Sequence, residues 1–376
     1  MRVLLTGTSN SIIPAGIKRA LEIDPRVTAF TNASYGASGS VAIGDHLRNV
    51  DFSQYEVCVI DYCVNEEVLL SSNASTLERA VSNIFALVDR ASRAGCLPVL
   101  AIYPTQHMLY IERPFENALV ESLVTRGVPV FNIYDYVIGL NERQGFSVEE
   151  LFLDPHHVLR KLSFFVGRQI LDFVEAIDFG ALELVETGET YHSLEFIPYA
   201  DLCFDGGEMQ EVVRKTTLMS RNLLNVTPGT RLTVETGKAS EIAGITFNLS
   251  RSWGVLSNAE NGAHLLEIAN KSQFTLDREL VLVSLPFHPT VPTDGRAVSL
   301  DYTANPVVGD NYPDLGLELL GLVVRNCEQS HPLAILCPAA VGPRLHEMIK
   351  PGREKALTRL LHAEIEQISE RKRVSR

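Results

Sequence analysis

The first part of the chain alternates short apolar runs with helix-like segments. Apolar runs occur at residues 3–5, 57–60, 99–102 and 128–131, and the stretches between them are long enough for helices. Continuous apolar runs at such wide spacing are typical of buried parallel strands joined by crossover helices. The pattern therefore predicts an α/β domain built on a parallel sheet.

Two helices of this part can be placed from the pattern. Residues 75–78 (Ser-Thr-Leu-Glu) fit a capping box in front of an apolar helical face, and Gly95 supplies a stop. A second helical pattern covers residues 159–173 and breaks at residues 176–180. We therefore expect the first domain to span residues 1–180.

The pattern changes character after residue 182. Short alternating segments at residues 231–235, 244–249 and 279–285 are separated by Pro, Gly, Asn and Asp turns. This predicts a mainly antiparallel β-sandwich domain over residues 181–345. Its only tryptophan, Trp253, could stack on a sugar ring, but a lone Trp in a sandwich is more often part of the core.

The last stretch, residues 346–376, is predicted to hold a helix and a basic tail. Apolar residues recur at i, i+3 and i+4 spacing between residues 354 and 371, which is typical of an amphipathic helix. We expect this helix to dock on the second domain or on another subunit, giving a homo-oligomer, and not on a membrane. The basic run at residues 371–373 is interpreted as a solvated end.

Charge and composition exclude several classes of protein. The chain has 33 Lys and Arg against 46 Asp and Glu, a formal charge of −13, which argues against a nucleic-acid binder with a broad basic face. The first residues lack a signal-peptide pattern, and no apolar run is long enough to span a membrane. These features predict a cytoplasmic protein with no membrane partner.

Cysteine and histidine spacing gives no sign of a metal or a disulfide. The six cysteines show no C-x-x-C spacing, so we expect them to be reduced core residues. His156 and His157 are adjacent and lack the i, i+4 spacing of a helical zinc site. No metal and no cofactor are predicted.

The turn after the first strand, residues 7–11 (Gly-Thr-Ser-Asn-Ser), is a candidate for chemistry. A dinucleotide site would need further glycines, but the corresponding positions hold Ser9 and Ile12. Sugar-nucleotide dehydrogenases, which begin with a similar string, have a tyrosine followed by lysine four residues on, and none of the 11 tyrosines has it. A nucleophilic Ser9 at the end of a parallel strand is therefore favoured.

A general base for Ser9 is available near the end of the first domain. In Asp154-Pro155-His156-His157, a turn entering a helix would let the Asp154 carboxylate reach Nδ1 of His157 while Nε2 faces Ser9. The alternative is an ordinary helix start, with Asp154 as the cap and Pro155 in the first turn. The i, i+3 offset from Asp154 favours His157 as the base, so His156 is interpreted as a neighbour or a substrate contact.

Four blocks in order carry a family resemblance. They are residues 7–9 (Gly-Thr-Ser), the glycine-rich loop at 32–39, residues 60–66 and Asp154-x-x-His157. Together, over about residues 1–175, they resemble the SGNH hydrolases, also called the GDSL esterase/lipase superfamily. The resemblance implies a flavodoxin-like, three-layer α/β/α domain and a serine hydrolase.

The resemblance also implies a role for each matching residue. Ser9 would be the nucleophile, His157 the general base and Asp154 the group that orients the histidine. The oxyanion hole would use the N–H of Ser9, the N–H of Gly36 and the side-chain amide of Asn65. Gly39 could serve in place of Gly36, because spacing alone does not choose between them.

The chain departs from the family pattern at three supporting positions. Thr8 stands where the family usually has Asp, and Cys63 and Glu66 replace the Gly and Asp that commonly surround Asn65. Asp61, at the end of the second apolar run, is interpreted as a cap more readily than as a ligand contact. These departures bear on the subfamily more than on the chemistry.

Three functions remain open from the sequence. The first is a serine esterase acting on a small-molecule or carbohydrate acyl ester. The second is an O-acyltransferase that uses the same triad on a polysaccharide or a sugar intermediate. The third is a non-catalytic protein that binds a glycan or a partner; family precedent for an added β-rich domain suggests carbohydrate recognition.

Overall fold

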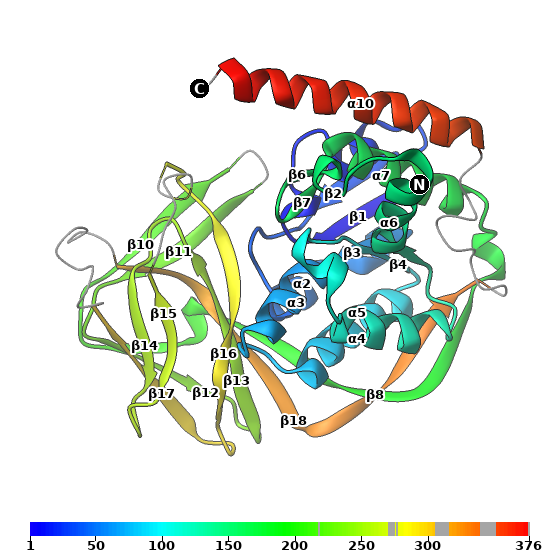
Figure 1. The fold of residues 1–376 in the computed structure, drawn as a ribbon. Coiled ribbons are helices and arrows are strands. Elements are labelled where there is room, and N and C mark those ends of the chain that lie inside the picture. The colour runs from blue at the N-terminus through cyan, green and yellow to red at the C-terminus, as the bar shows by residue number, and fades with distance from the viewer. Residues whose placement is uncertain (217–218, 270–274, 276, 305–315, 339–350, 375–376) are drawn as a thin grey trace.

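The structure, a computed structural model, describes residues 1–216, 219–269, 275, 277–304, 316–338 and 351–374. Figure 1 shows an α/β part on one side, two β-sheets on the other, and a long helix, α10, lying over the α/β part. The fold class expected from the sequence is therefore confirmed.

The α/β part is built on a five-stranded parallel sheet with the order β2-β1-β3-β4-β5. This is the flavodoxin-like order, in which ligands bind beyond the carboxyl ends of β1 and β3, where the direction of winding changes. The strands are β1 (Arg2–Gly7), β2 (Ala29–Asn32), β3 (Val57–Asp61), β4 (Leu97–Ile102) and β5 (Val130–Asn132).

The edge strand β2 was not predicted. Its side chains alternate between exposed and half-buried positions, because it borders solvent on one side. It therefore lacks the continuous apolar run by which β3 and β4, buried along their whole length, are recognised.

Helices cover both faces of this sheet. Helix α7 packs on α1 on one face, while α2, α4 and α5 lie together on the other (Figure 1), which makes three layers. The helices are α1 (Ile17–Ile23), α2 (Ile43–Asn49), α3 (Cys63–Ser71), α4 (Leu77–Arg93), α5 (Pro114–Leu119), α6 (Ile133–Gln144) and α7 (Arg160–Glu175).

Helix α4 begins and ends close to where the sequence predicts. Its cap is Thr76, whose side chain accepts a hydrogen bond from the N–H of Arg79, so the cap lies one residue beyond Ser75. Gly95 ends the segment with a φ of 76°, a left-handed conformation that glycine adopts without strain.

Short helical turns join these elements. They are η1 (Ser9–Ser11), η2 (Ser40–Ala42), η3 (Phe52–Gln54), η4 (His107–Tyr110), the π-turn η5 (Val120–Val124), η6 (Glu149–Leu151), η7 (Phe179–Ala181) and η8 (Tyr199–Asp201). Two of them, η1 and η2, lie at the carboxyl end of the sheet, where β1 and the loop after β2 end.

The second part consists of two antiparallel sheets that enclose their own apolar core. One sheet has the order β10-β11-β18-β13-β16, with β8 also pairing with β18. Its strands are β8 (Glu183–Pro198), β10 (Met209–Lys215), β11 (Ser220–Val226), β13 (Ser240–Asn248), β16 (Leu282–Pro292) and β18 (Leu317–Cys337). The other, ordered β15-β14-β17-β12-β9, is formed by β9 (Cys203–Asp205), β12 (Thr230–Glu235), β14 (Gly254–Asn258), β15 (His264–Ile268) and β17 (Ala297–Thr303).

Two long strands carry the second part back onto the first. β8 and β18 pair with each other and run past α2 and α4 (Figure 1), and Phe196, Val323 and Ile335 are buried in the core cluster of the α/β part. Asp89 of α4 accepts hydrogen bonds from the Tyr191 hydroxyl at 2.9 Å and from the Ala334 N–H at 2.7 Å. The two parts therefore share buried structure.

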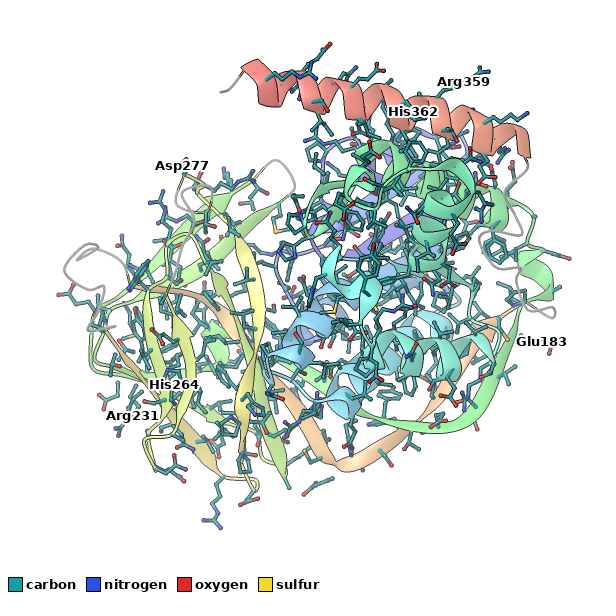
Figure 2. The ribbon with its side chains drawn as sticks, in the orientation of Figure 1. Glu183, Arg231, His264, Asp277, Arg359 and His362 are labelled. Carbon is teal, nitrogen blue, oxygen red and sulfur yellow. The ribbon has the colours of Figure 1, made fainter. Side chains whose placement is uncertain are left out.

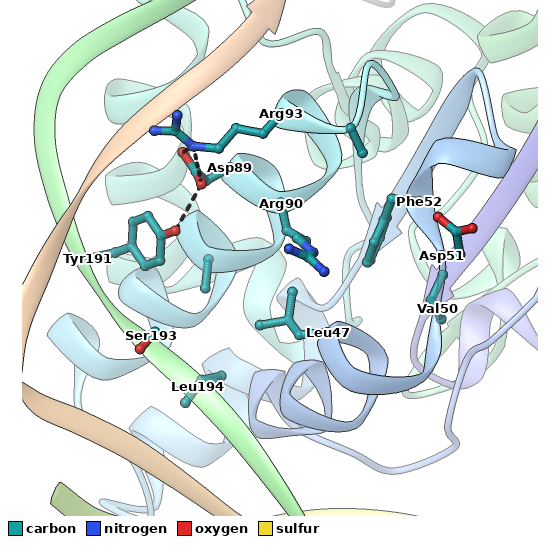
Figure 3. A pocket seen from close by; sticks show the side chains of 12 residues that line it. Leu47, Val50, Asp51, Phe52, Asp89, Arg90, Arg93, Tyr191, Ser193 and Leu194 are labelled. Carbon is teal, nitrogen blue, oxygen red and sulfur yellow. Dashed lines mark hydrogen bonds and ion pairs between the residues drawn. The ribbon is translucent and has the colours of Figure 1, made fainter. Parts of the chain in front are cut away.

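A hollow of about 440 Å³ lies between α2, α4 and β8, on the face of the parallel sheet that α2 and α4 cover. It is away from the carboxyl edge of that sheet. Figure 3 shows Arg90, Tyr191 and Leu47 around it, with Arg93 paired to Asp89.

Helix α10 (Pro351–Val374) packs on the α/β part, whereas the sequence led us to expect docking on the second domain or on another subunit. Leu357 and Leu361 are buried in the core cluster of the α/β part. Glu364 accepts a hydrogen bond from the N–H of Lys161 at the start of α7, and the ring of His362 (Figure 2) lies 4.6 Å from that of Phe146. The apolar face that could have met another subunit is thus used within the chain.

The structure also bears on the cysteines and on membrane-spanning helices. All six cysteines are free, but Cys203 and Cys327 are exposed, so the expectation of six core cysteines was wrong for these two. Within the described ranges, none of the helices has the length and apolar character needed to cross a membrane.

Candidate active site

Ser9 follows β1 directly, at the point where β1 and β3 present their carboxyl ends. It opens the 3₁₀ turn η1 and is partly buried. Gly7, two residues earlier, pairs with Asp61 of β3, and a Cβ on Gly7 would lie 2.3 Å from the Asp61 carbonyl oxygen. Glycine therefore lets the turn that carries Ser9 sit against β3.

Asp61 lies under this turn and is 0% exposed. Its Oδ2 accepts a hydrogen bond from the Ser11 hydroxyl at 2.9 Å. Burial raises the pKa of Asp61 to about 7, against the opposing effect of the Ser11 hydroxyl and the nearby Thr8 and Ser11 N–H groups. Asp61 therefore supports the turn after β1 and is not the cap of α3, whose N-cap is Tyr62.

The segment with the candidate base is a tight hairpin, not a helix start. β6 (Phe152–Asp154) pairs with β7 (His157–Val158), and α7 begins only at Arg160. The alternative in which Asp154 caps a helix is therefore wrong. The hairpin turn places the Asp154 carboxylate and the His157 ring on the same side.

Ser9, His157 and Asp154 form a continuous chain of hydrogen bonds. Nε2 of His157 is 2.7 Å from Oγ of Ser9, and Nδ1 is 2.8 Å from both carboxylate oxygens of Asp154. An ionised carboxylate only accepts hydrogen bonds, so Nδ1 carries the proton and Nε2 is left to accept one from Ser9. This is the geometry of an activated serine nucleophile.

Asp154 is held ionised by its neighbours. Burial raises its pKa, but the hydrogen bond from His157 and that from the N–H of His156, at 2.9 Å, outweigh this effect, and the pKa of Asp154 lies below its ordinary value. The side chains of Asp154 and His157 are 44% and 20% exposed, so solvent reaches both groups.

The glycine-rich loop after β2 runs beside the η1 turn, which carries Ser9. The Tyr35 N–H donates to the carbonyl of Gly7 at 3.0 Å, which fixes the loop to the end of β1. Gly36 comes next, and a Cβ placed on it would meet only Cδ1 of Ile12, at 3.1 Å. Gly36 therefore lies beside the η1 turn.

Asn65 and Gly39 also lie at this loop. Nδ2 of Asn65, in the first turn of α3, donates to the carbonyl of Ser38 at 2.8 Å and keeps a second hydrogen. The N–H of Gly39 donates to the carbonyl of Ser284 at 3.2 Å, so it is already engaged. Of the two glycines that the sequence left open, Gly36 is the one whose N–H makes no hydrogen bond within the described part of the chain.

Three residues that hold this loop were not identified from the sequence. The Ser38 hydroxyl accepts from the N–H of Ser284 at 2.8 Å, and Glu66 accepts from the N–H of Ser40. Glu66 thus has a local role at a position where the family pattern has Asp. Ser38 lies in a Gly-Ala-Ser-Gly loop that suggests only a turn, and Ser284 is 246 residues away, so no local pattern links them.

Further buried carboxyl groups lie near the same edge of the sheet. Glu67 accepts a hydrogen bond from the N–H of Glu116 at 2.9 Å, and Glu116 accepts one from Asn132 at 2.7 Å. Burial raises the pKa of Glu67 and raises that of Glu116 to about 7. These groups tie α3, α5 and β5 together and do not touch the triad.

The two other candidate residues, His156 and Trp253, lie in different environments. His156 is exposed beside the triad, with its ring 6.4 Å from that of His157. Trp253 is 6% exposed within the β-rich part, so its ring is a core residue and not a sugar-stacking surface. The described residues contain no group of three or more His, Cys, Asp or Glu side chains that could hold a metal ion.

Comparison with known proteins gives a structural match and no sequence match. No protein-family model and no curated protein matches the sequence. Among solved structures, a two-domain esterase (CEX) active on acetylated mannans matches with a TM-score of 0.58 and 14% identity, covering 88% of this chain and 92% of that chain. An esterase of the same description, co-crystallized with mannopentaose, matches with a TM-score of 0.58 and 12% identity, covering 88% and 91%.

At this level of identity the match concerns the fold. It extends over nearly the whole length of both chains, so it includes the α/β part and the β-rich part together. The α/β fold implied by the SGNH resemblance and the β-rich fold predicted from the alternating segments are therefore both present in this chain.

Proposed function

We propose that the protein is a serine esterase of the SGNH type that removes acyl groups from a carbohydrate ester. The observation that carries the proposal is the pair of contacts at His157, with Nε2 2.7 Å from Ser9 Oγ and Nδ1 2.8 Å from Asp154. A protein that only binds a glycan has no need for a serine hydroxyl held in this way.

The reaction begins with a proton transfer. His157 Nε2 takes the proton of Ser9 Oγ as that oxygen bonds to the ester carbonyl carbon, which gives a tetrahedral oxyanion. When the intermediate collapses, the bond to the sugar oxygen breaks and Nε2 returns the proton to that oxygen. Water then attacks the acyl-serine by the same route, releasing the carboxylic acid and restoring Ser9.

The oxyanion would be held by three donors. These are the N–H of Ser9, the N–H of Gly36 and the second amide hydrogen of Asn65. Each aligned donor in such a hole is worth about 3 kcal/mol of transition-state stabilisation. The position of Gly36 beside Ile12, and that of Asn65 beside Ser38, support this assignment.

Hydrolysis is favoured over acyl transfer by the exposure of the triad. Transfer to a sugar hydroxyl requires a site that excludes water. The side chains of Asp154 and His157 are 44% and 20% exposed. Water can therefore reach the acyl-serine, and we propose an esterase in preference to an O-acyltransferase.

The carbohydrate substrate is proposed from the shared two-part fold. The matching esterase is described as active on acetylated mannans. The test is acetate release from acetylated mannan and xylan oligosaccharides by the wild type and by Ser9→Ala. Release by the wild type alone would support the proposal, and equal release by both proteins would refute it.

A further inference from the structure

The glycine-rich loop of the α/β part is bound to an edge strand of the β-rich part. β16 is the last strand in its sheet, and such an edge presents N–H and C=O groups without a strand partner. On β16, the backbone N–H and C=O of Ser284 both form hydrogen bonds with the loop. Its N–H donates to the Ser38 hydroxyl at 2.8 Å, and its C=O accepts from the Gly39 N–H at 3.2 Å.

A second strand of the β-rich part reaches the next residue of the loop. Arg325 of β18 donates to Oδ1 of Asn83 at 2.7 Å, and Nδ2 of Asn83 donates to the Ser40 hydroxyl at 2.9 Å. Arg325 is 3% exposed and is also paired with Glu241 at 2.5 Å. This contact therefore acts on the loop independently of Ser284.

The α/β part holds the same loop from the opposite side. Asn65 donates to the carbonyl of Ser38 at 2.8 Å, and Glu66 accepts from the N–H of Ser40. A Cβ on Gly39 would lie 2.6 Å from Cδ1 of Leu69, so the loop fits closely against α3. Ser38 is thus hydrogen-bonded to α3 through its carbonyl and to the β-rich part through its hydroxyl.

We propose that Ser38 is a positioning residue through which the β-rich part holds the loop of Gly36 in register with Ser9 and Asn65. The inference rests on the proposed function, since it assigns the β-rich part a role in the acyl-transfer step itself. Oxyanion donors act only when they are aligned in advance, and a misplacement of about 1 Å can cost a hundredfold in rate. Ser38 therefore affects kcat and not substrate affinity.

The test compares Ser38→Ala with a matched variant, Thr246→Val. Thr246 is 0% exposed and its hydroxyl is 2.7 Å from that of Ser284, so its loss also breaks a buried hydroxyl contact to β16 but leaves the loop untouched. We expect Ser38→Ala to lower kcat at least about tenfold with KM within about twofold. Thr246→Val should match it in melting temperature and keep the wild-type kcat.

Hydrogen exchange provides a readout that does not depend on activity. In Ser38→Ala the amides of residues 36–40 should exchange faster than in the wild type, whereas Thr246→Val should leave them unchanged. Unchanged exchange, or an equal loss of kcat in both variants, would overturn the inference. If Ser38→Ala does not fold, Ser38→Cys keeps a weaker hydrogen-bonding group and should give an intermediate kcat.

Failure of the inference is distinct from failure of the proposed function. If Ser9→Ala retains wild-type turnover, the esterase assignment is wrong whatever Ser38→Ala does. If turnover depends on Ser9 and Ser38→Ala retains the wild-type kcat, the esterase assignment stands and the positioning role is wrong.

Discussion

Asp154 and His157 face each other across a hairpin turn, with both carboxylate oxygens of Asp154 2.8 Å from Nδ1 of His157. The contact fixes the tautomer of the imidazole, because only a protonated Nδ1 can donate to a carboxylate. The remaining nitrogen, Nε2, then faces Ser9 and can accept a hydrogen bond from its hydroxyl. A separation of three residues in the sequence is enough because β6 and β7 bring both side chains to one side.

Asp154→Asn should lower kcat by about 10²- to 10⁴-fold with little change in KM, since the amide no longer fixes the tautomer. The folded-state pKa of Asp154 lies below its ordinary value, so the charge that holds the tautomer persists at all pH values above that range and is lost only as pH falls through the lowered pKa. Steady-state kinetics at neutral pH measure the effect. His156→Ala is the control, because His156 donates its hydrogen bond to Asp154 from the backbone N–H, which alanine keeps; a similar loss there would contradict the assignment.

The two loop glycines should differ in their response to alanine. Gly36→Ala should keep kcat within a few-fold, because an added Cβ meets only the flexible end of Ile12 and the backbone N–H remains. Gly39→Ala should lower both kcat and the melting temperature, because its Cβ would lie 2.6 Å from Leu69 and 2.8 Å from the Glu66 carboxylate. Equal behaviour of the two variants in both assays would contradict this packing.

Stability should fall as pH rises toward neutrality. Burial raises the folded-state pKa of Asp61 to about 7, while an unfolded Asp titrates near its ordinary value of about 3.9. Between these values the folded protein holds a proton that the unfolded chain has lost, so this contribution is fully present at low pH and disappears as pH rises through about 7.

Asp61→Asn removes this titration. Each such group changes the free energy of unfolding by about 1.4 kcal/mol per pH unit in this window, so the slope between pH 5 and 6.5 should be smaller in the variant by about 1 kcal/mol per pH unit. Glu116, with a pKa raised to about 7, should supply part of the slope that remains. Urea unfolding at several pH values measures this slope of the free energy of unfolding. Asp51→Asn, at a residue with a lowered pKa, should leave the slope unchanged, and an unchanged slope in Asp61→Asn would contradict the burial of a neutral carboxyl.

An ion pair within the β-rich part should be sensitive at Arg325. Arg325 of β18 is 3% exposed and pairs with Glu241 of the neighbouring strand β13, and removing one partner of a buried pair typically costs about 3 kcal/mol. Arg325→Met should therefore lower the free energy of unfolding by about that amount in urea. Arg231→Met breaks an exposed pair with Asp301 and should leave the unfolding midpoint unchanged; the reverse ranking would show that the Arg325–Glu241 pair contributes little to stability.

Much of the α/β part could be predicted because its signals are local. The buried strands β3 and β4 are continuous apolar runs, and the residues of the triad come from two short segments, residues 7–9 and 154–157. The edge strand β2 was not predicted because one of its sides is exposed. The hairpin at Asp154 was not predicted because Asp followed by Pro is equally typical of a helix start.

What could not be predicted depends on contacts between distant residues. The sequence places Ser38 in a plain turn, and its partner Ser284 lies in an alternating strand with no motif. Likewise, the apolar face of α10 indicates that the helix docks, but only the structure shows that it docks on α7 through Glu364 and Lys161. Periodicity identifies the buried face of an element but not the surface that covers it.

The proposed activation of Ser9 as a nucleophile can be tested by intact-mass analysis of the wild type and of Ser9→Ala after treatment with a fluorophosphonate probe. The probe phosphonylates serine oxygens that a neighbouring base has activated. A single adduct on the wild type and none on Ser9→Ala is the predicted result. No adduct on the wild type, or the same adduct on Ser9→Ala, would show that Ser9 is not an activated nucleophile.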